Sequence, residues 1–174
     1  LEPANLQIVL YRLYQDAVTQ GLWDEATERG TGLTLARYRA LGGTREILAG
    51  YLDEVIMDLG SDAARRQAQA ILKNMVTAER TKAALSGQEI ARGQLIAQVG
   101  VAEAELDTLL AYLRGRRIVR KFGDEDRYEL THEVLVEKVW AWISDEELRV
   151  LDVRDMLGRE LSNYEKFGHL LTRE

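Results

Sequence analysis

The sequence predicts a mainly α-helical protein in which a four-helix bundle is followed by a winged helix-turn-helix domain with a small β-hairpin. Two observations predict this fold class. Apolar residues recur every three or four positions through most of the chain, as on one face of a helix. Between residues 118 and 131 this spacing is replaced by two short β-type runs around a polar turn. We expect a helical, lid-like bundle over residues 1–80, a winged-helix domain over 81–144 and a helical extension over 145–174.

The first helix of the bundle is predicted to begin at Pro3, because proline suits a first helical turn, where its missing N–H costs nothing. It should end near Gly21. The glycine-rich stretch 22–32 is predicted to be a loop. The apolar face of this helix consists of Leu6, Val9, Leu10, Leu13 and Ala17.

Three further helices follow with short connections. Thr34 is a candidate N-cap for a short helix that ends at Gly42, and Thr44 is a candidate cap for the next helix. That helix carries a regular apolar stripe and should end at Gly60. Ser61 then opens a fourth helix. Four helices with short connections predict a small bundle.

The helix-turn-helix prediction depends on two helices joined by one glycine. Ser86 and Glu89 have the spacing of a capping box and predict a helix over residues 87–99. Gly100 would make the turn, and residues 103–114 would form the second helix.

The predicted hairpin pairs residues 118–122 with residues 127–131, and its Gly–Asp turn would be the wing. Another helix should run from Val134 to about Trp142. Ser144 and Glu147 form a second capping box that opens the polar C-terminal segment.

Composition excludes several classes of protein. The absence of cysteine excludes disulfides and thiolate zinc sites and suggests a reducing, cytoplasmic location. Two histidines, His132 and His169, leave little room for a metal site, so none is expected. No apolar run approaches the roughly 20 residues of a membrane span. Because the chain begins at Leu1 without an initiator methionine, we expect it to be an excised part of a longer protein.

Charge is distributed unevenly along the chain, which has a net charge of −6. Residues 1–60 carry a net −4, residues 61–121 a net +5 and residues 122–174 a net −7. Because nucleic-acid binding needs a basic face, the acidic net charge of the chain argues against a nucleic-acid partner. Residues 61–121 are the exception, because their net charge is positive.

Several short motifs, in order and spacing, resemble the region that follows the nucleotide-binding core in bacterial STAND-type signalling NTPases, relatives of the NOD-like receptors. The resemblance covers about residues 1–145. The matching segments are Pro3-Ala-Asn-Leu-Gln-Ile-Val9, Arg12-Leu13, Leu41-Gly-Gly43, Ile47-Leu48, Tyr51-Leu52, Tyr128-Glu-Leu-Thr-His-Glu-Val-Leu135, Trp140 and Trp142.

The resemblance implies a helical lid and a winged helix that report on a bound nucleotide. In this family a winged-helix histidine contacts the β-phosphate of ADP and keeps the molecule closed. By its position in the motif, His132 would be that residue. Thr131 and Glu133 depart from the methionine and aspartate that flank this histidine in eukaryotic members.

The chain contains no G-x-x-x-x-G-K-[ST] motif, so we do not expect it to be an enzyme by itself. The resemblance implies that ADP or ATP with Mg²⁺ binds the parent protein, which would be an ATPase. The implied partners are an intramolecular P-loop core and effector domains, and the activated parent would be able to form oligomers.

A basic run between the predicted second helix and the wing is a candidate interaction surface. It has two interpretations: phosphate contact by a DNA-binding winged helix, or a solvated face that docks on an acidic neighbour. The second is favoured, because the helix that would enter the groove begins with acidic residues and the wing turn is acidic. The run consists of Arg114, Arg116, Arg117, Arg120 and Lys121.

The predicted function is therefore that of a regulatory module, the lid and winged helix of a STAND-like nucleotide switch. The alternative is a winged-helix transcription regulator whose helical half is a dimerisation or sensor domain. A protein-interaction adaptor is a third, weaker alternative.

Overall fold

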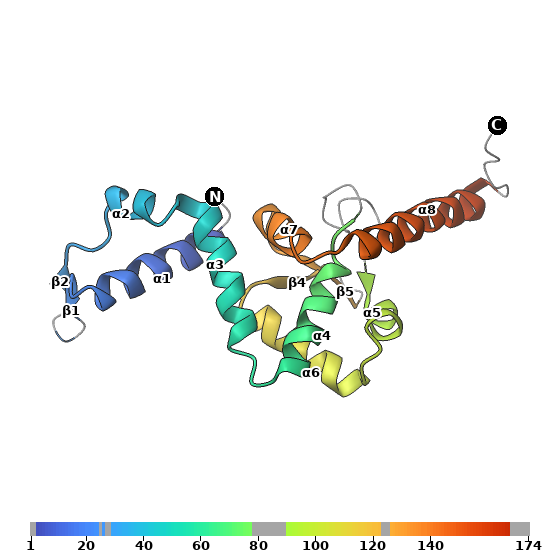
Figure 1. The fold of residues 1–174 in the computed structure, drawn as a ribbon, viewed down its shortest axis with the longest axis horizontal. Helices are drawn as coiled ribbons and strands as arrows, with labels where there is room; N and C mark the ends of the chain where they lie inside the picture. Colours follow the sequence, from blue (N-terminus) through green and yellow to red (C-terminus); the bar gives the residue numbers. More distant parts are fainter. Residues whose placement is uncertain (1–2, 25, 27–28, 78–89, 123–125, 168–174) are drawn as a thin grey trace. The chain divides into compact units, whose positions relative to one another are not determined.

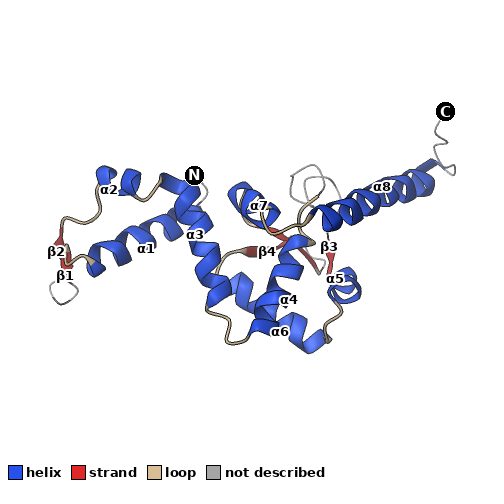
Figure 2. Ribbon diagram, viewed as in Figure 1, coloured by secondary structure: helices blue, strands red, loops and turns tan. Residues whose placement is uncertain are grey.

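The computed structural model describes residues 3–24, 26, 29–77, 90–122 and 126–167, and its described part is mainly helical with two small sheets (Figures 1 and 2). The chain divides into two compact units, residues 1–60 and residues 61–174.

In the first unit, α1 (Pro3–Thr19) packs on α3 (Gly43–Met57), and α2 (Leu35–Ala40) packs on α3 as well. The predicted start of the first helix at Pro3 is confirmed. Thr34 caps α2 as expected, because its side chain accepts a hydrogen bond from the Arg37 N–H. The buried cluster between α1 and α3 consists of Val9, Leu13 and Ile47, with Tyr38 and Leu41 packed against it.

The prediction that residues 22–32 form a loop is wrong in part. They contain a two-stranded antiparallel sheet, in which β1 (Trp23–Asp24) pairs with β2 (Arg29–Gly30). Gly30 is required there, because a Cβ at this position would lie 2.3 Å from the Leu22 carbonyl oxygen. The sequence did not reveal this sheet, because two-residue strands are too short to show alternation.

Thr44 is not the N-cap of α3, contrary to expectation. The cap position is Gly42, in the left-handed region with φ 82°, and Thr44 lies inside the first turn. The Tyr38 hydroxyl replaces the missing cap, since it accepts the Thr44 N–H at 3.0 Å and bonds the Thr44 hydroxyl at 2.9 Å. These hydrogen bonds to Thr44 lower the pKa of Tyr38. One tyrosine therefore fixes α2 to the start of α3.

The second unit contains a three-stranded antiparallel sheet of order β3-β5-β4 with helices around it. The predicted α6 and the hairpin of β4 and β5 are confirmed, with Val119 opposite Leu130. The predicted C-terminal extension is a long helix. The elements are α4 (Asp62–Lys73), β3 (Ile90–Ala91), α5 (Arg92–Val99), α6 (Glu103–Gly115), β4 (Val119–Phe122), β5 (Arg127–Leu130), α7 (Glu133–Trp140) and α8 (Asp145–Phe167).

Two expectations about the second unit need correction. First, α4 falls in this unit and packs on α5 and α7, whereas it was expected to join the helices of residues 1–60 in one bundle. Secondly, the helix predicted over 87–99 begins only at Arg92, because Ile90 and Ala91 pair with β5 as β3. The predicted capping box of Ser86 and Glu89 lies outside the described residues. Gly100 ends α5 in the left-handed conformation, as expected.

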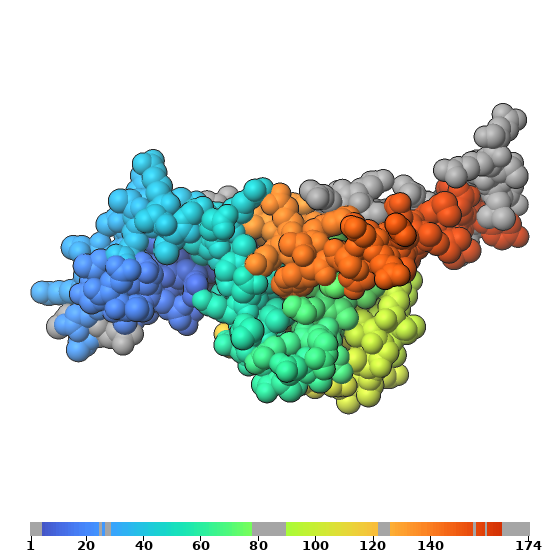
Figure 3. Space-filling view, viewed as in Figure 1, coloured from blue at the N-terminus to red at the C-terminus, as the bar shows by residue number. Residues whose placement is uncertain are grey.

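Helix α8 lies at the surface of the second unit (Figure 3). The capping box at its start is confirmed: the Ser144 N–H donates to the Glu147 carboxylate at 2.8 Å, and the Glu147 N–H donates to the Ser144 hydroxyl at 3.3 Å. Lys73 pairs with Glu147 at 2.7 Å, and Arg154 donates to the Asn74 side chain at 2.9 Å. The end of α4 thus holds the first half of α8.

We expect the attachment of α8 to weaken in acid. The hydrogen bond from Lys73, followed by the bond from the Ser144 N–H, lowers the pKa of Glu147 below its ordinary value of 4.5. A carboxyl with a lowered pKa stabilises the folded state above its ordinary pKa, and this contribution is lost as pH falls through the folded value. The ion pair is partly exposed, so solvent screening limits the effect to about 0.5–1 kcal/mol.

Amide hydrogen exchange in the first turns of α8, measured between pH 6 and pH 3 and corrected for intrinsic rates, checks this expectation. Wild type should lose protection below about pH 4.5. Glu147→Gln should lose the pH dependence, whereas the neighbouring variant Glu146→Gln should keep it. Equal behaviour of the two variants would contradict the role of Glu147.

Candidate functional site

His132 lies where β5 passes into α7, at the N-cap position of that helix. Its backbone is extended, with φ −149° and ψ 143°, and its side chain is partly buried. The ring Nδ1 accepts the Val134 N–H at 3.0 Å. His132 acts as the N-cap, a position usually occupied by serine, threonine or aspartate, because its side chain accepts a hydrogen bond from one of the free N–H groups of the first helical turn.

This hydrogen bond assigns the ring tautomer. Because Nδ1 is an acceptor, the neutral ring carries its proton on Nε2. The remaining nitrogen is therefore a donor, and it lies at the N-terminal end of a helix, where the helix dipole favours negative charge.

Thr131 connects His132 to the turn between α6 and β4. Its side chain is buried, and its N–H donates to the Ile118 carbonyl at 3.0 Å. Its hydroxyl donates to the Arg117 carbonyl at 2.7 Å, with the Ile118 carbonyl at 3.2 Å. In the sequence, Thr131 stands out only as a departure from a family motif. A threonine directly after Leu130, the last residue of the strand, was the available signal, because a buried hydroxyl needs an acceptor.

The structure distinguishes the five cations of the predicted basic surface. Arg120 pairs with Glu129 across the β4–β5 ladder, and the Glu129 side chain is only 4% exposed. Lys121 pairs with Asp126 at 2.8 Å, which lowers the pKa of that aspartate. Cations held in this way are less available to a partner.

The other three cations lie at the end of α6 and in the turn that follows it. Arg116 stacks on the Tyr112 ring, 5.4 Å from its centroid. Arg114 and Arg117 are exposed. The five residues therefore do not form one uniform surface.

The acidic start of α6 is held by a residue that the sequence analysis missed. Arg92, the first residue of α5, donates from Nε to Asp107 at 2.7 Å and from the guanidinium to Glu103 at 3.3 Å. The Arg92 hydrogen bond is the main cause of the lowered pKa of Asp107. No motif indicated this contact, because it depends on how α5 and α6 are packed.

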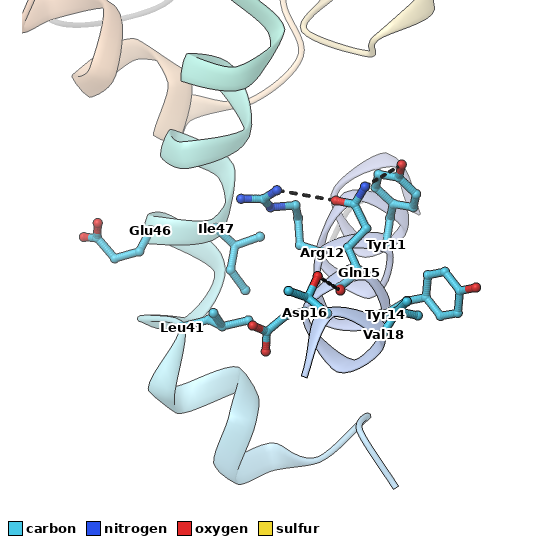
Figure 4. A pocket seen from close by; sticks show the side chains of 10 residues that line it. Tyr11, Arg12, Tyr14, Gln15, Asp16, Val18, Leu41, Glu46 and Ile47 are labelled. Atoms are coloured by element: carbon cyan, nitrogen blue, oxygen red, sulfur yellow. Dashed lines mark hydrogen bonds between the residues drawn. The ribbon is translucent and has the colours of Figure 1, made fainter. Parts of the chain in front are cut away.

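Each unit also has a hollow. In the first unit a cavity of about 630 Å³ lies beside α1 and α3 (Figure 4). Two of its charged groups are engaged by neighbours: Arg12 pairs with Glu54 at 2.6 Å, and Asp16 pairs with Arg37. In the second unit a groove of about 510 Å³ lies between the end of α4 and α8. Neither hollow contains His132 or the basic run.

The described residues contain no group of three or more histidines and carboxylates able to hold a metal ion. Within the same ranges, none of the helices has the length and apolar character needed to cross a membrane. His169 lies outside the described residues.

Comparison with protein families matches the chain to the novel STAND NTPase 1 family over residues 6–169. The chain belongs to the novel STAND NTPase 1 family. No curated protein and no solved structure matches it significantly. The family match extends from the first helix of unit 1 to beyond α8, so both units of this novel STAND NTPase 1 chain belong to it.

Proposed function

We propose that this novel STAND NTPase 1 chain is the regulatory module of a signalling ATPase, formed by a helical lid and a winged helix. Family membership supports the relation to STAND NTPases. The order of elements in the second unit supports the winged helix: two helices joined at Gly100, then a hairpin whose inner strand also pairs with β3. The first unit, built on α1 and α3, would be the lid.

The observation that carries the proposal is the hydrogen bond between His132 Nδ1 and the Val134 N–H. With Nδ1 as the acceptor, the neutral ring carries its proton on Nε2 at the start of α7, and an N–H donor there suits one oxygen of a β-phosphate. A P-loop ATPase core elsewhere in the parent protein would hold the rest of the ADP with Mg²⁺, because this chain has no P-loop.

The proposed mechanism is a shift between two states. In the closed state His132 adds a contact to bound ADP, and this differential contact stabilises the closed conformation. Exchange of ADP for ATP removes the contact, so that the winged helix moves away from the core and effector domains assemble. The chain itself supplies a hinge and a packing surface, and the bond chemistry belongs to the core.

The test is ADP affinity, measured by calorimetry on a longer protein that carries the ATPase core. We expect His132→Asn to lower ADP affinity about tenfold, which corresponds to about 1.4 kcal/mol for one charge-assisted hydrogen bond. Asparagine is a good N-cap, so this variant removes the ring donor and keeps the cap of α7.

His132→Ala removes both the ring and the cap, and it provides the comparison. It should show the same loss of ADP affinity together with a lower melting temperature. If His132→Asn binds ADP as tightly as wild type, the phosphate contact is wrong, whatever the alanine variant does.

The alternative, a DNA-binding regulator, has less support from the charges. A helix entering the major groove needs side chains free to reach bases and phosphates. Here Asp107 and Glu103 line the start of α6 and are held by Arg92, and Arg120 and Lys121 are engaged in ion pairs. Salt-dependent binding of the chain to duplex DNA would favour the alternative.

A further inference from the structure

Helix α8 carries a stripe of exposed apolar side chains along one side. At about 100° per residue, its five members all lie within about 40° of a line through Leu157. Each member is between 51% and 67% exposed. Contiguous exposed apolar surface of this kind marks interaction sites, whereas single exposed apolar residues need no explanation. The α8 stripe consists of Val150, Val153, Leu157, Leu161 and Tyr164.

The α8 stripe lies on a different side of the helix from the residues that attach α8 to the second unit. Leu151 is buried, and Arg154 donates to the Asn74 side chain at 2.9 Å. Around the helix, Arg154 and Leu151 are turned by about 60° and 120° from the line through Leu157. The attachment of α8 to the end of α4 therefore leaves the stripe open to another surface.

The spacing of the α8 stripe is the same in both directions along the helix. Leu157 is its centre, Val153 and Leu161 are each four residues away, and Val150 and Tyr164 are each seven residues away. Two antiparallel copies of α8 that meet at Leu157 would therefore place apolar side chains opposite each other along the whole stripe. Such self-complementarity is what a two-fold symmetric interface requires, so it favours a second copy of this chain as the occupant.

The two ends of the α8 stripe are also complementary in shape. Val150, at one end, lines the groove of about 510 Å³ between the end of α4 and α8. Tyr164, at the other end, is the largest side chain of the stripe and is half exposed. The antiparallel arrangement brings Tyr164 of the second copy to Val150, at the groove. A tyrosine that enters a pocket on its partner is a common energetic anchor of protein interfaces.

The area and the charges of α8 are consistent with a weak antiparallel dimer. The exposed parts of the five side chains amount to roughly 500 Å² per copy, so pairing would bury about 1,000 Å², the lower end of specific interfaces. A parallel pair would bring two acidic helix starts together, whereas an antiparallel pair separates these like charges. The acidic first turn contains Asp145, Glu146 and Glu147.

We propose that α8 is a self-association surface, through which two copies of this chain form an antiparallel dimer. Leu157 lies at the two-fold axis, and Tyr164 of each copy enters the groove beside Val150 of the other. The inference does not depend on the proposed nucleotide switch, because it uses neither His132 nor a bound nucleotide.

The test is sedimentation equilibrium of this chain over a range of concentrations. We expect a monomer–dimer equilibrium with a dissociation constant in the micromolar range, as suits a small interface. Leu157→Glu places two carboxylates against each other at the axis and should raise this constant at least about tenfold. At protein concentrations well below the constant, substitutions in the stripe report on the monomer alone.

Met156→Glu is the matched control, because Met156 is 45% exposed but turned about 100° away from Leu157. A glutamate that flanks a helix interface is tolerated, so the dissociation constant should stay within about threefold of wild type. Both substituted residues are exposed, and equal melting temperatures at low concentration would show that both variants fold. A monomeric wild type, unchanged dimerisation of Leu157→Glu, or equal weakening by both variants would overturn the proposal.

Cysteine cross-linking tests the antiparallel arrangement. The chain contains no cysteine, so each introduced thiol is unique. Mixed chains carrying Val153→Cys and Leu161→Cys should form a disulfide between the two variants on mild oxidation. Either variant alone should not, because like positions in the antiparallel pair are about 12 Å apart, beyond the disulfide limit of about 7 Å. Efficient cross-linking of either variant to itself would show a parallel pair and overturn the antiparallel dimer.

Discussion

Replacing Leu130 with alanine should lower the free energy of unfolding of the second unit by about 3 kcal/mol. Leu130 is the last residue of β5, is fully buried and lies opposite Val119 in the ladder. Truncation would leave a cavity that the surrounding sheet and helices fill only in part, so the loss exceeds the transfer free energy of the deleted atoms. Urea unfolding followed by circular dichroism measures the change.

Leu157→Ala is the matched control. Leu157 lies on α8 and is 59% exposed, so the same substitution should change the free energy of unfolding by less than about 0.5 kcal/mol. Equal losses at positions 130 and 157 would contradict the described core.

Replacing Arg120 with methionine should destabilise the second unit by about 2 kcal/mol. Glu129 has a nearly buried side chain, and the guanidinium of Arg120 is its partner across the ladder. Removing the cation leaves a desolvated carboxylate, whose cost is 3–5 kcal/mol when both partners are buried. Arg120 is half exposed, so water offsets part of that cost.

A double-mutant cycle tests this assignment. Adding Glu129→Leu to Arg120→Met should restore most of the lost stability, since an apolar pair of similar size often replaces a buried ion pair without loss. The control is Lys121→Met, which removes the partner of Asp126. Because Asp126 is well exposed, this substitution should lower the free energy of unfolding by less than about 1 kcal/mol. Additive effects of the two substitutions at 120 and 129 would contradict the predicted coupling.

Local signals in the sequence predicted most of the helices. Thr34, Ser61 and Ser144 cap α2, α4 and α8 as expected, and Gly100 ends α5. Caps and apolar periodicity depend on residues within one or two turns, so they can be recognised without knowledge of the rest of the fold. The β4–β5 hairpin was predictable for the same reason, since its turn is short.

Elements with distant partners were not predicted. Strand β3 has two residues and exists because Ile90 and Ala91 pair with β5, more than thirty positions later. Helix α4 has the periodicity of a bundle member, but its partners are α5 and α7. Apolar spacing identifies the face that a helix buries, and it does not identify the surface that covers that face.

At the candidate site, the sequence by itself determined that His132 follows a strand and begins a helix, and that five cations lie nearby. Only the tertiary structure decided which of them are paired with carboxylates. Strand register pairs Arg120 with Glu129, and the Thr131 hydroxyl donates to the Arg117 carbonyl at the end of the hairpin. Register and side-chain pairing arise from contacts between segments far apart in the chain, which no local pattern encodes.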